Sequence, residues 1–255
     1  MCAPEASRAR FHHHSGLAAA ARAGVLLFEN SPAYRIDRAV RPVVKTAECQ
    51  VRCAHVVLAG NVYLGEYGDR VAPSINARIM PVGTYMIATE PLGAAHAEAL
   101  MPGRAAASDN NLVLGYFRLS ADHRMLFGAG ESYNARTPRN LVERMRARMV
   151  DVFPQIANHR VDFAWGGFVD VTMNRAPDIG RIGGDIYYVQ GFSGLGLVFA
   201  GMAGKLVAEA INADASRFDV FTEMRHQPFP GGRHFRTPAL VLGMWYYRLR
   251  DALAI

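Results

Sequence analysis

Runs of β-branched and aromatic residues, separated by turn-forming residues, dominate the first two thirds of the chain. Such runs predict strands, because these side chains fit a pleated and half-buried surface. Turns at Pro91, Pro102 and Asp122 separate the middle runs, so this part of the chain is predicted to form an antiparallel sheet. The expected strands are residues 25–28, 33–37, 43–47, 50–58, 78–89, 112–120, 124–128, 161–165 and 186–190.

A helical repeat replaces the strand pattern in three places. The first is an Ala-rich stretch, residues 16–24, that ends on a glycine. In the second, Thr137 and Pro138 supply an N-cap and a first helical residue, and Leu141 and Met145 follow at helical spacing. We therefore expect helices at residues 16–24, 138–153 and 197–212.

A glycine-rich loop joins the last predicted strand to the last of these helices. This order brings main-chain N–H groups and the positive end of a helix dipole to one point, where an anionic or electron-rich ligand edge can bind. We expect these N–H groups to face an open cavity. The residues concerned are Gly191, Phe192, Ser193, Gly194, Leu195, Gly196 and Leu197.

Two other interpretations of the loop stay open. It could be a structural strand-to-helix turn without a ligand, or a self-contained dinucleotide site. The second interpretation needs an acidic residue at the end of another parallel strand about 20 residues on. Asp214 and Asp219 lie in a polar stretch instead, which counts against it.

Length and composition indicate a globular protein of the mixed α/β class. The chain has 255 residues, of which 51% are hydrophobic and 20% charged, enough for a buried core in one or two domains. The predicted antiparallel sheet divides the chain into segments 1–70, 71–165 and 166–255, with the middle segment as an inserted domain.

Charge and cysteine content narrow the function classes. The formal net charge is +6, but only Lys45 and Lys205 are lysines and the arginines are scattered, so we expect no nucleic-acid partner. Residues 186–204 carry no charge, yet five glycines and Gln190 favour a buried strand, turn and helix, so no membrane span is expected. Three cysteines without a CxxC pair predict no metal site and fit a reducing compartment, hence the cytoplasm.

Several ordered motifs resemble FAD-dependent oxidoreductases of the D-amino-acid oxidase type, with the gamma-glutamylputrescine oxidase-like branch as the most similar group. The resemblance runs from about Gly16 to the end of the chain, and a set of ordered motifs is more specific than any one glycine pattern. The motifs are residues 56–61 (VVLAGN), 88–92 (ATEPL), 116–119 (YFRL), 165–167 (WGG), 174–180 (NRAPDIG), 186–196 (IYYVQGFSGLG), 203–211 (AGKLVAEAI) and 228–232 (PFPGG).

The resemblance implies a cofactor, a reaction and residue roles. FAD would be bound near Ala59, Gly60 and the glycine-rich loop, and the inserted sheet would present Tyr116 and Trp165 to an amine or amino-acid-like substrate. The reaction would be oxidation of a C–N bond, with the flavin as the chemically active group. Aromatic packing within a sheet is the alternative interpretation of Tyr116 and Trp165, and no catalytic side chain is assigned.

Three departures from the family pattern bear on these implications. No GxGxxG turn, on which the FAD pyrophosphate rests in the family, precedes Gly16. Leu195 stands where the branch usually has His, and Val169 stands where amino-acid oxidases carry an Arg for the substrate carboxylate. The chain thus resembles a truncated member, and we expect it to bind FAD weakly or not at all when alone and to prefer amines. The alternative is a non-catalytic remnant or interaction module, completed by a partner chain that supplies the dinucleotide-binding unit.

Overall fold

The computed structural model describes residues 15–65, 71–109, 114–132, 139–231, 235, 238 and 241–242. The chain forms two compact units. The first contains described residues of 1–76, 179–189 and 201–224, and the second those of 77–178, 190–200 and 225–255. The division into three segments made from the sequence stays a prediction, although its first and last segments both contribute to the first unit.

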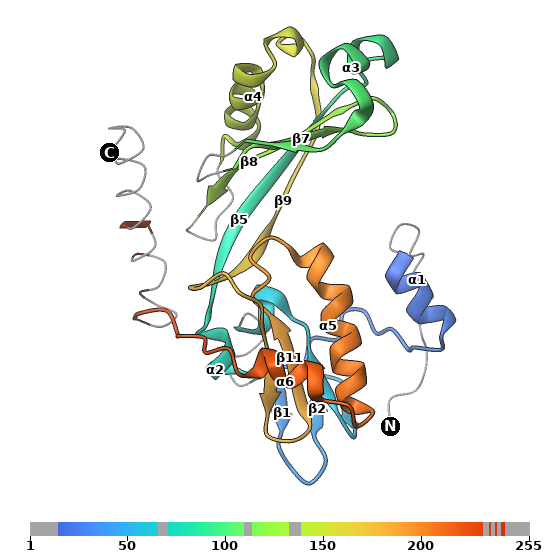
Figure 1. The fold of residues 1–255 in the computed structure, drawn as a ribbon, viewed down its shortest axis with the longest axis vertical. Coiled ribbons are helices and arrows are strands. Elements are labelled where there is room, and N and C mark those ends of the chain that lie inside the picture. Colours follow the sequence, from blue (N-terminus) through green and yellow to red (C-terminus); the bar gives the residue numbers. More distant parts are fainter. Residues whose placement is uncertain are drawn as a thin grey trace. The chain divides into compact units, whose positions relative to one another are not determined.

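The first unit is built on two three-stranded sheets (Figure 1). One is an antiparallel meander of β1 (Arg35–Asp37), β2 (Val43–Lys45) and β3 (Gln50–Arg52). The other has the order β10 (Asp178–Ile182), β11 (Ile186–Gln190) and β4 (Val56–Leu58), with β11 and β4 parallel. The remaining elements are α1 (Ser15–Arg22), the 3-10 helix η1 (Asn61–Gly65), α2 (Pro73–Asn76), α6 (Ser216–Thr222) and most of α5 (Gly196–Ile211).

Helix α5 buries one stripe of its surface. Ala203, Leu206, Val207 and Ala210 are buried, and their spacing of three, one and three residues is that of a single helix face. The helix begins at Gly196, within one residue of the predicted start, and β11 has the predicted bounds. Both elements were predictable because the apolar pattern of each is local and strong.

The second unit is built on one antiparallel sheet of five strands. Their order is β6 (Ala107–Ser108), β7 (Tyr116–Leu119), β8 (Met125–Ser132), β5 (Ile79–Thr89) and β9 (Val161–Thr172). Every neighbouring pair is antiparallel. The antiparallel sheet predicted for the middle of the chain is thereby confirmed, within a mixed α/β fold.

Helices pack on one face of this sheet. They are α3 (Ala94–Leu100), α4 (Leu141–Val152) and the 3-10 helices η2 (Pro102–Arg104) and η3 (Pro154–Ile156). Met145 and Met149 of α4 join Tyr85, Ile87 and Phe127 of the strands in one buried cluster. The covered face therefore includes Tyr85 and Ile87 of β5 and Met125, Phe127 and Ala129 of β8.

Three predicted strands differ from the observed ones. Residues 25–28 form no strand, and Val25, Leu26 and Phe28 are exposed, because no described strand pairs with them. The predicted strand 50–58 is two strands in different sheets, β3 and β4. Strand β9 does not end at Trp165 but continues to Thr172, since it pairs with β5 along its whole length.

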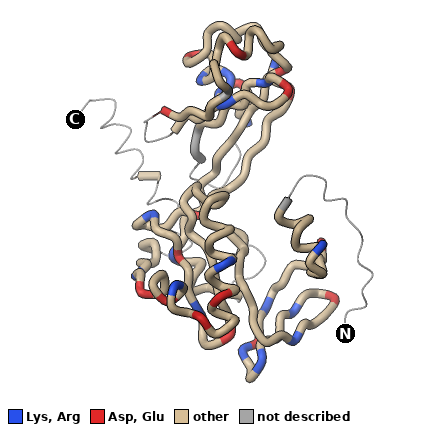
Figure 2. Tube along the Cα trace, turned by 45° about the vertical axis from the view of Figure 1, so that its right-hand side comes forward, with Lys and Arg blue, Asp and Glu red and all other residues tan. Residues whose placement is uncertain are grey.

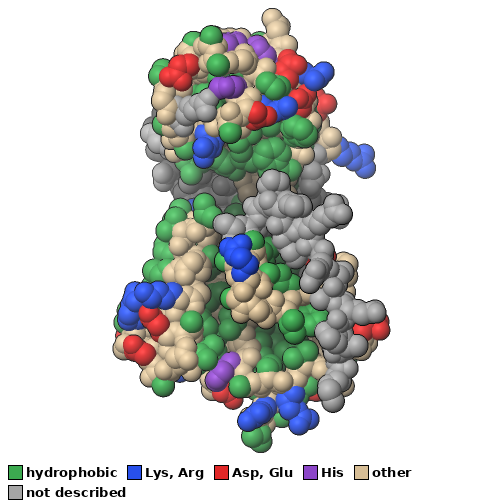
Figure 3. All heavy atoms as spheres, turned by 90° about the vertical axis from the view of Figure 1, so that its right-hand side faces the viewer, with side chains coloured by type: hydrophobic (Ala, Val, Ile, Leu, Met, Phe, Trp, Pro, Cys, Tyr) green, Lys and Arg blue, Asp and Glu red, His purple; other side chains and the backbone are tan. Residues whose placement is uncertain are grey.

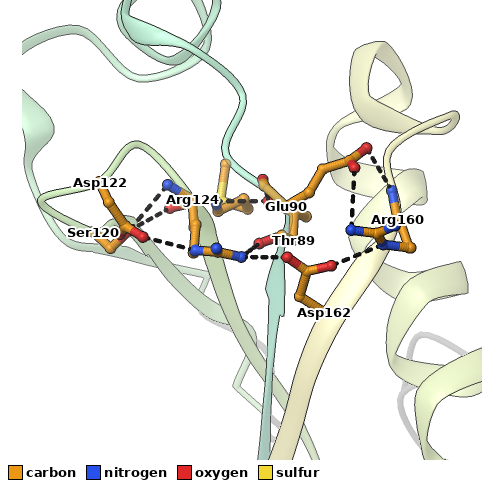
Figure 4. Close-up of polar contacts among 8 residues, drawn as sticks. Thr89, Glu90, Ser120, Asp122, Arg124, Arg160 and Asp162 are labelled. Carbon is orange, nitrogen blue, oxygen red and sulfur yellow. Dashed lines mark hydrogen bonds and ion pairs between the residues drawn. The ribbon is translucent and has the colours of Figure 1, made fainter.

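An ion-pair network closes one end of the large sheet (Figure 4). Arg124 donates from Nη1 to the carbonyl oxygen of Thr89 at 2.8 Å and to Oδ2 of Asp162 at 2.6 Å. Arg160 donates from Nε to Oδ1 of Asp162 at 2.8 Å. Hydrogen bonds from Arg124 and Arg160 lower the pKa of Asp162. The network joins β8, β5 and β9 at their ends.

The charge distribution and the apolar helices do not identify a nucleic-acid or membrane partner. Figure 2 shows basic and acidic residues interspersed along both units. Among the residues that the structure describes, no single helix is long and apolar enough to cross a membrane, and α5 and α6 meet that requirement only as a pair bent by 117°. No group of three or more His, Cys, Asp or Glu side chains within the described ranges could hold a metal ion. The expected absence of nucleic-acid, membrane and metal partners stays a prediction.

Candidate cofactor and substrate site

Both residues predicted for the substrate side lie on the open face of the five-stranded sheet. Tyr116 of β7 pairs with Gly128 of β8, Gly128 with Met86 of β5, and Met86 with Trp165 of β9. These four residues form one row across four strands, and side chains in one row point to the same side of a sheet. Tyr116 and Trp165 therefore share the face opposite α3 and α4.

Gly128 gives the ring of Tyr116 room to lie across the sheet. A Cβ at position 128 would lie 2.1 Å from Cε2 of Tyr116 and 2.6 Å from Sδ of Met86. The ring thus reaches over β8 toward β5, where the hydroxyls of Tyr116 and Thr84 share a hydrogen bond of 2.7 Å. This bond fixes the orientation of a half-buried aromatic ring on an otherwise open surface.

Two more aromatic groups stay accessible on this face. The exposed fraction is 46% for Trp165 and 56% for Phe163, so both rings are accessible to a ligand. Figure 3 shows hydrophobic side chains gathered at the surface of the unit that contains α3 and α4. The guanidinium of Arg124 lies 5.1 Å from the centroid of the Phe163 ring, so this ring already stacks with a cation. Arg118, on the next row, is exposed.

The glycine-rich loop lies in the same unit and is tied to β9. Asp170, which is 5% exposed, accepts hydrogen bonds from the N–H of Gly191 (2.6 Å, Oδ2) and of Phe192 (3.2 Å, Oδ1). The main-chain oxygen of Asp170 accepts a third bond, from the N–H of Ser193, at 2.9 Å. Burial raises the pKa of Asp170, and the hydrogen bonds from the loop oppose that shift.

This geometry corrects one expectation for the loop. The N–H groups of Gly191, Phe192 and Ser193 do not face an open cavity, because Asp170 accepts all three. Farther along, the structure records no protein acceptor for the N–H groups of Gly194, Gly196 or Leu197 among the described residues. Gly196 and Leu197 are the first two residues of α5, Gly194 precedes the helix by two residues, and Leu197 is 98% exposed. The open part of the loop is its second half.

Backbone conformation explains why glycines occupy this loop. Gly191 has φ +75°, and a Cβ there would lie 2.5 Å from Cγ2 of Thr172. Gly194 has φ +94° with open space around the position of a Cβ. The first glycine permits a close approach to β9, and the second permits a turn of the chain before the helix.

The remaining predicted cofactor residues, Ala59 and Gly60, lie in the first unit. They line a pocket of about 610 Å³. Consecutive residues from Val56 onward line it, which places the pocket along the edge of β4, since alternate side chains of a strand point to opposite faces. The other lining residues are Ala33, Ile36, Val44, Val57, Leu58, Asn61, Tyr63, Leu64 and Val71.

Sequence reasoning missed Asp170 and its buried neighbour Asp178. Asp178 accepts hydrogen bonds from Nε2 of Gln190 at 2.8 Å and from Nη1 of Arg78 at 3.4 Å. Arg78 is 100 residues away in the chain, so no local pattern could have identified this pair. An acidic residue inside an apolar strand was the available indication for Asp170.

Comparisons with known proteins decide the family. The model of the family described as FAD dependent oxidoreductase (DAO) matches residues 12–210. The chain belongs to this family. It is 40% identical over 232 residues to the gamma-glutamylputrescine oxidoreductase of Escherichia coli (strain K12), covering 91% of this chain and 54% of that protein. The probable oxidoreductase OrdL of Haemophilus influenzae is 39% identical over 229 residues, covering 89% of this chain and 52% of that one.

The fold is shared with solved flavoprotein structures. The crystal structure of glycine oxidase from Geobacillus kaustophilus matches with a TM-score of 0.67 at 19% identity, covering 82% of this chain and 56% of that chain. This chain spans about half the length of the curated relatives that it matches. The family is FAD-dependent, and the open N–H groups at the start of α5 fit an electron-rich ring edge.

Proposed function

We propose that this chain carries the flavin-facing loop and the substrate face of an FAD-dependent oxidoreductase that oxidises a C–N bond. The supporting observation is the course of β9. This strand carries Trp165 on the open face of the sheet and, five residues later, Asp170, which holds the glycine-rich loop. One strand thus links the substrate face and the loop within one unit, with the side chains of Trp165 and Asp170 on opposite faces of the strand because their spacing is odd.

The residues of the chain would perform distinct tasks. Gly194, Gly196 and Leu197 would donate hydrogen bonds to FAD, which when bound supplies the two-electron acceptor for the reaction. Ala59 and Gly60 would bind another part of the cofactor. Tyr116 and Trp165 would orient the substrate, Tyr116 being held by its bond to Thr84, while Phe192, Ser193, Gly191 and Leu195 would shape the loop. Which side chain, if any, acts as a catalytic acid or base is not assigned.

We further propose that the substrate is an amine rather than an α-amino acid. Val169 occupies the position expected of the carboxylate-binding Arg, and the open face offers aromatic rings to a cation. The E. coli relative is named for gamma-glutamylputrescine, which makes that compound the first to test. Arg118 is exposed on this face and could bind a carboxylate, so Arg118→Ala should weaken binding of carboxylate-bearing substrates, gamma-glutamylputrescine included, and leave binding of a simple primary amine unchanged.

The test is a flavin titration followed by reduction. The purified chain is titrated with FAD while flavin fluorescence is followed, and the bound flavin is then mixed without oxygen with gamma-glutamylputrescine, a simple primary amine or an α-amino acid. Loss of the yellow flavin absorbance with the amines supports the proposal. Bound flavin that neither amines nor amino acids bleach would refute C–N oxidation, and bleaching by the amino acid alone would refute the amine preference.

The pocket along β4 favours a second candidate, an interaction module. β4 is the edge strand of its sheet, and Val57 in it is 46% exposed, a surface that a further chain could cover. A partner chain that supplies a dinucleotide-binding unit stays a prediction, as does a cytoplasmic location. FAD binding that requires co-production with the other half of a relative would support this candidate.

A further inference from the structure

Asp170 is a buried carboxylate on β9 that accepts hydrogen bonds from the glycine-rich loop. Each of its side-chain oxygens accepts a main-chain N–H of the glycine-rich loop, at 2.6 and 3.2 Å, and its own carbonyl accepts a third. A buried anion is costly unless its hydrogen bonds are satisfied. Here the satisfying donors come from consecutive residues of one loop, so the carboxylate and the loop conformation depend on each other.

We propose that Asp170 is a positioning residue, which holds the first half of the glycine-rich loop so that the N–H groups of Gly194, Gly196 and Leu197 stay available to the flavin. Three consecutive donors bonded to one residue define the path of the chain through Gly191, Phe192 and Ser193. This path then turns through Gly194 into α5, where the free donors lie. The inference rests on the proposed FAD site, but the loop conformation can be measured without FAD.

Replacing the Asp170 carboxylate by its neutral isostere, an amide, would cost one of its two hydrogen bonds to the loop. In an Asp170→Asn variant, one oxygen becomes an NH2 group, which would face an N–H donor of Gly191 or Phe192 across about 3 Å. A protonated Asp170 has the same defect, because its hydroxyl is a donor. Burial and the charge of Asp178 raise the pKa of Asp170, and Asp178 is itself paired with Arg78. Acidification should therefore loosen the loop in the wild type.

The first measurement concerns the loop in the full chain without FAD. Amide hydrogen exchange and the 1H–15N shifts of Gly191 and Phe192 are compared in the wild type, Asp170→Asn and Asp162→Asn. The last variant is the control, because Asp162 lies on the same strand and pairs with arginines instead of the loop. We expect roughly tenfold faster exchange at both amides in Asp170→Asn only. In the wild type and the control only, the Gly191 shift should titrate above the usual pKa of an aspartate, because burial raises the pKa of Asp170.

The second measurement concerns the cofactor. We expect Asp170→Asn to weaken FAD binding at least about tenfold and Asp162→Asn to leave it unchanged. Wild-type exchange rates in Asp170→Asn, or unchanged FAD affinity despite a loosened loop, would overturn the proposal. A wild-type chain that binds no FAD, either alone or co-produced with the other half of a relative, would count against the proposed function. The exchange and titration of the Gly191 amide would still decide whether Asp170 holds the loop.

Discussion

The five-stranded sheet has two faces that come from the same strands but differ in exposure. On the face under α3 and α4, Ile87 is 0% and Phe127 2% exposed. On the other face, Trp165 and Phe163 are about half exposed, and Tyr116 is held by one hydrogen bond. Aromatic side chains contribute most to stability where their large apolar area is buried. The covered face therefore contributes the core of this unit, and the exposure of the open face agrees with the proposal that it binds a substrate.

The comparison predicts its largest effect on the covered face. Ile87→Ala would leave a cavity in a closely packed cluster and lower the free energy of unfolding by about 3 kcal/mol. Chemical denaturation followed by far-UV circular dichroism measures this loss. FAD affinity of the folded variant should not change. A loss below about 1 kcal/mol would show that the covered face is not the principal core of the unit.

A smaller effect is expected at Gly128 on the open face. Gly128→Ala would displace the ring of Tyr116, break its bond to Thr84 and lower the free energy of unfolding by about 1 to 2 kcal/mol. Tyr116→Phe is the matched control, because it removes the hydrogen bond and leaves the ring in place. In a double-mutant cycle, Gly128→Ala should cost little when Tyr116 is already Ala. A full cost in that background would mean that Gly128 acts by another route.

Elements with a strong local sequence pattern could be predicted, whereas the arrangement of strands in the five-stranded sheet could not. β11 and α5 were predicted to within a residue, because periodic apolar residues and a glycine-rich loop define both. The row that places Tyr116 and Trp165 on the same face, four strands wide, was not predictable. Its register depends on strands that are far apart in the chain. The continuation of β9 beyond Gly166 was missed for the same reason: β5 supplies its hydrogen-bonding partner.

The candidate site likewise has a part that could be predicted from the sequence, the glycine-rich loop, and a part that could not, Asp170. The loop was predicted because a cluster of glycines in the sequence indicates backbone conformations that other residues rarely adopt, and Gly191 and Gly194 do have positive φ. For Asp170 the sequence offered only an acidic residue in an apolar segment, and its role could not be predicted because it depends on a loop 21 residues away. The same long-range contact explains why the N–H groups of the first half of the loop were wrongly expected to be open.

Trp165 tests whether the open face is free of a structural role. Trp165→Ala should lower the free energy of unfolding by no more than about 1 kcal/mol, because nearly half of the side chain is already in water. In a Trp245→Phe background, which leaves Trp165 as the only tryptophan, its emission should be quenched readily by acrylamide. FAD should quench it too if the flavin binds over this face. Emission protected from acrylamide in the absence of FAD would contradict the open face.

The smallest effect is expected at the ion-pair network, which belongs to neither face, and it depends on pH. Arg124 and Arg160 hold the pKa of Asp162 below its usual value, so in the folded state the carboxylate resists protonation. Its contribution to stability is therefore present above the unfolded pKa of about 3.9 and is lost as pH falls through the folded pKa. The pH dependence that Asp170 contributes has the opposite sign. Burial raises its pKa, so its contribution to the free energy of unfolding falls as pH rises, although protonation removes one of its hydrogen bonds to the loop. The melting temperature of Asp162→Asn should lie slightly below that of the wild type at neutral pH, and the two should converge on acidification; parallel curves down to about pH 3 would show that the network does not stabilise the sheet end.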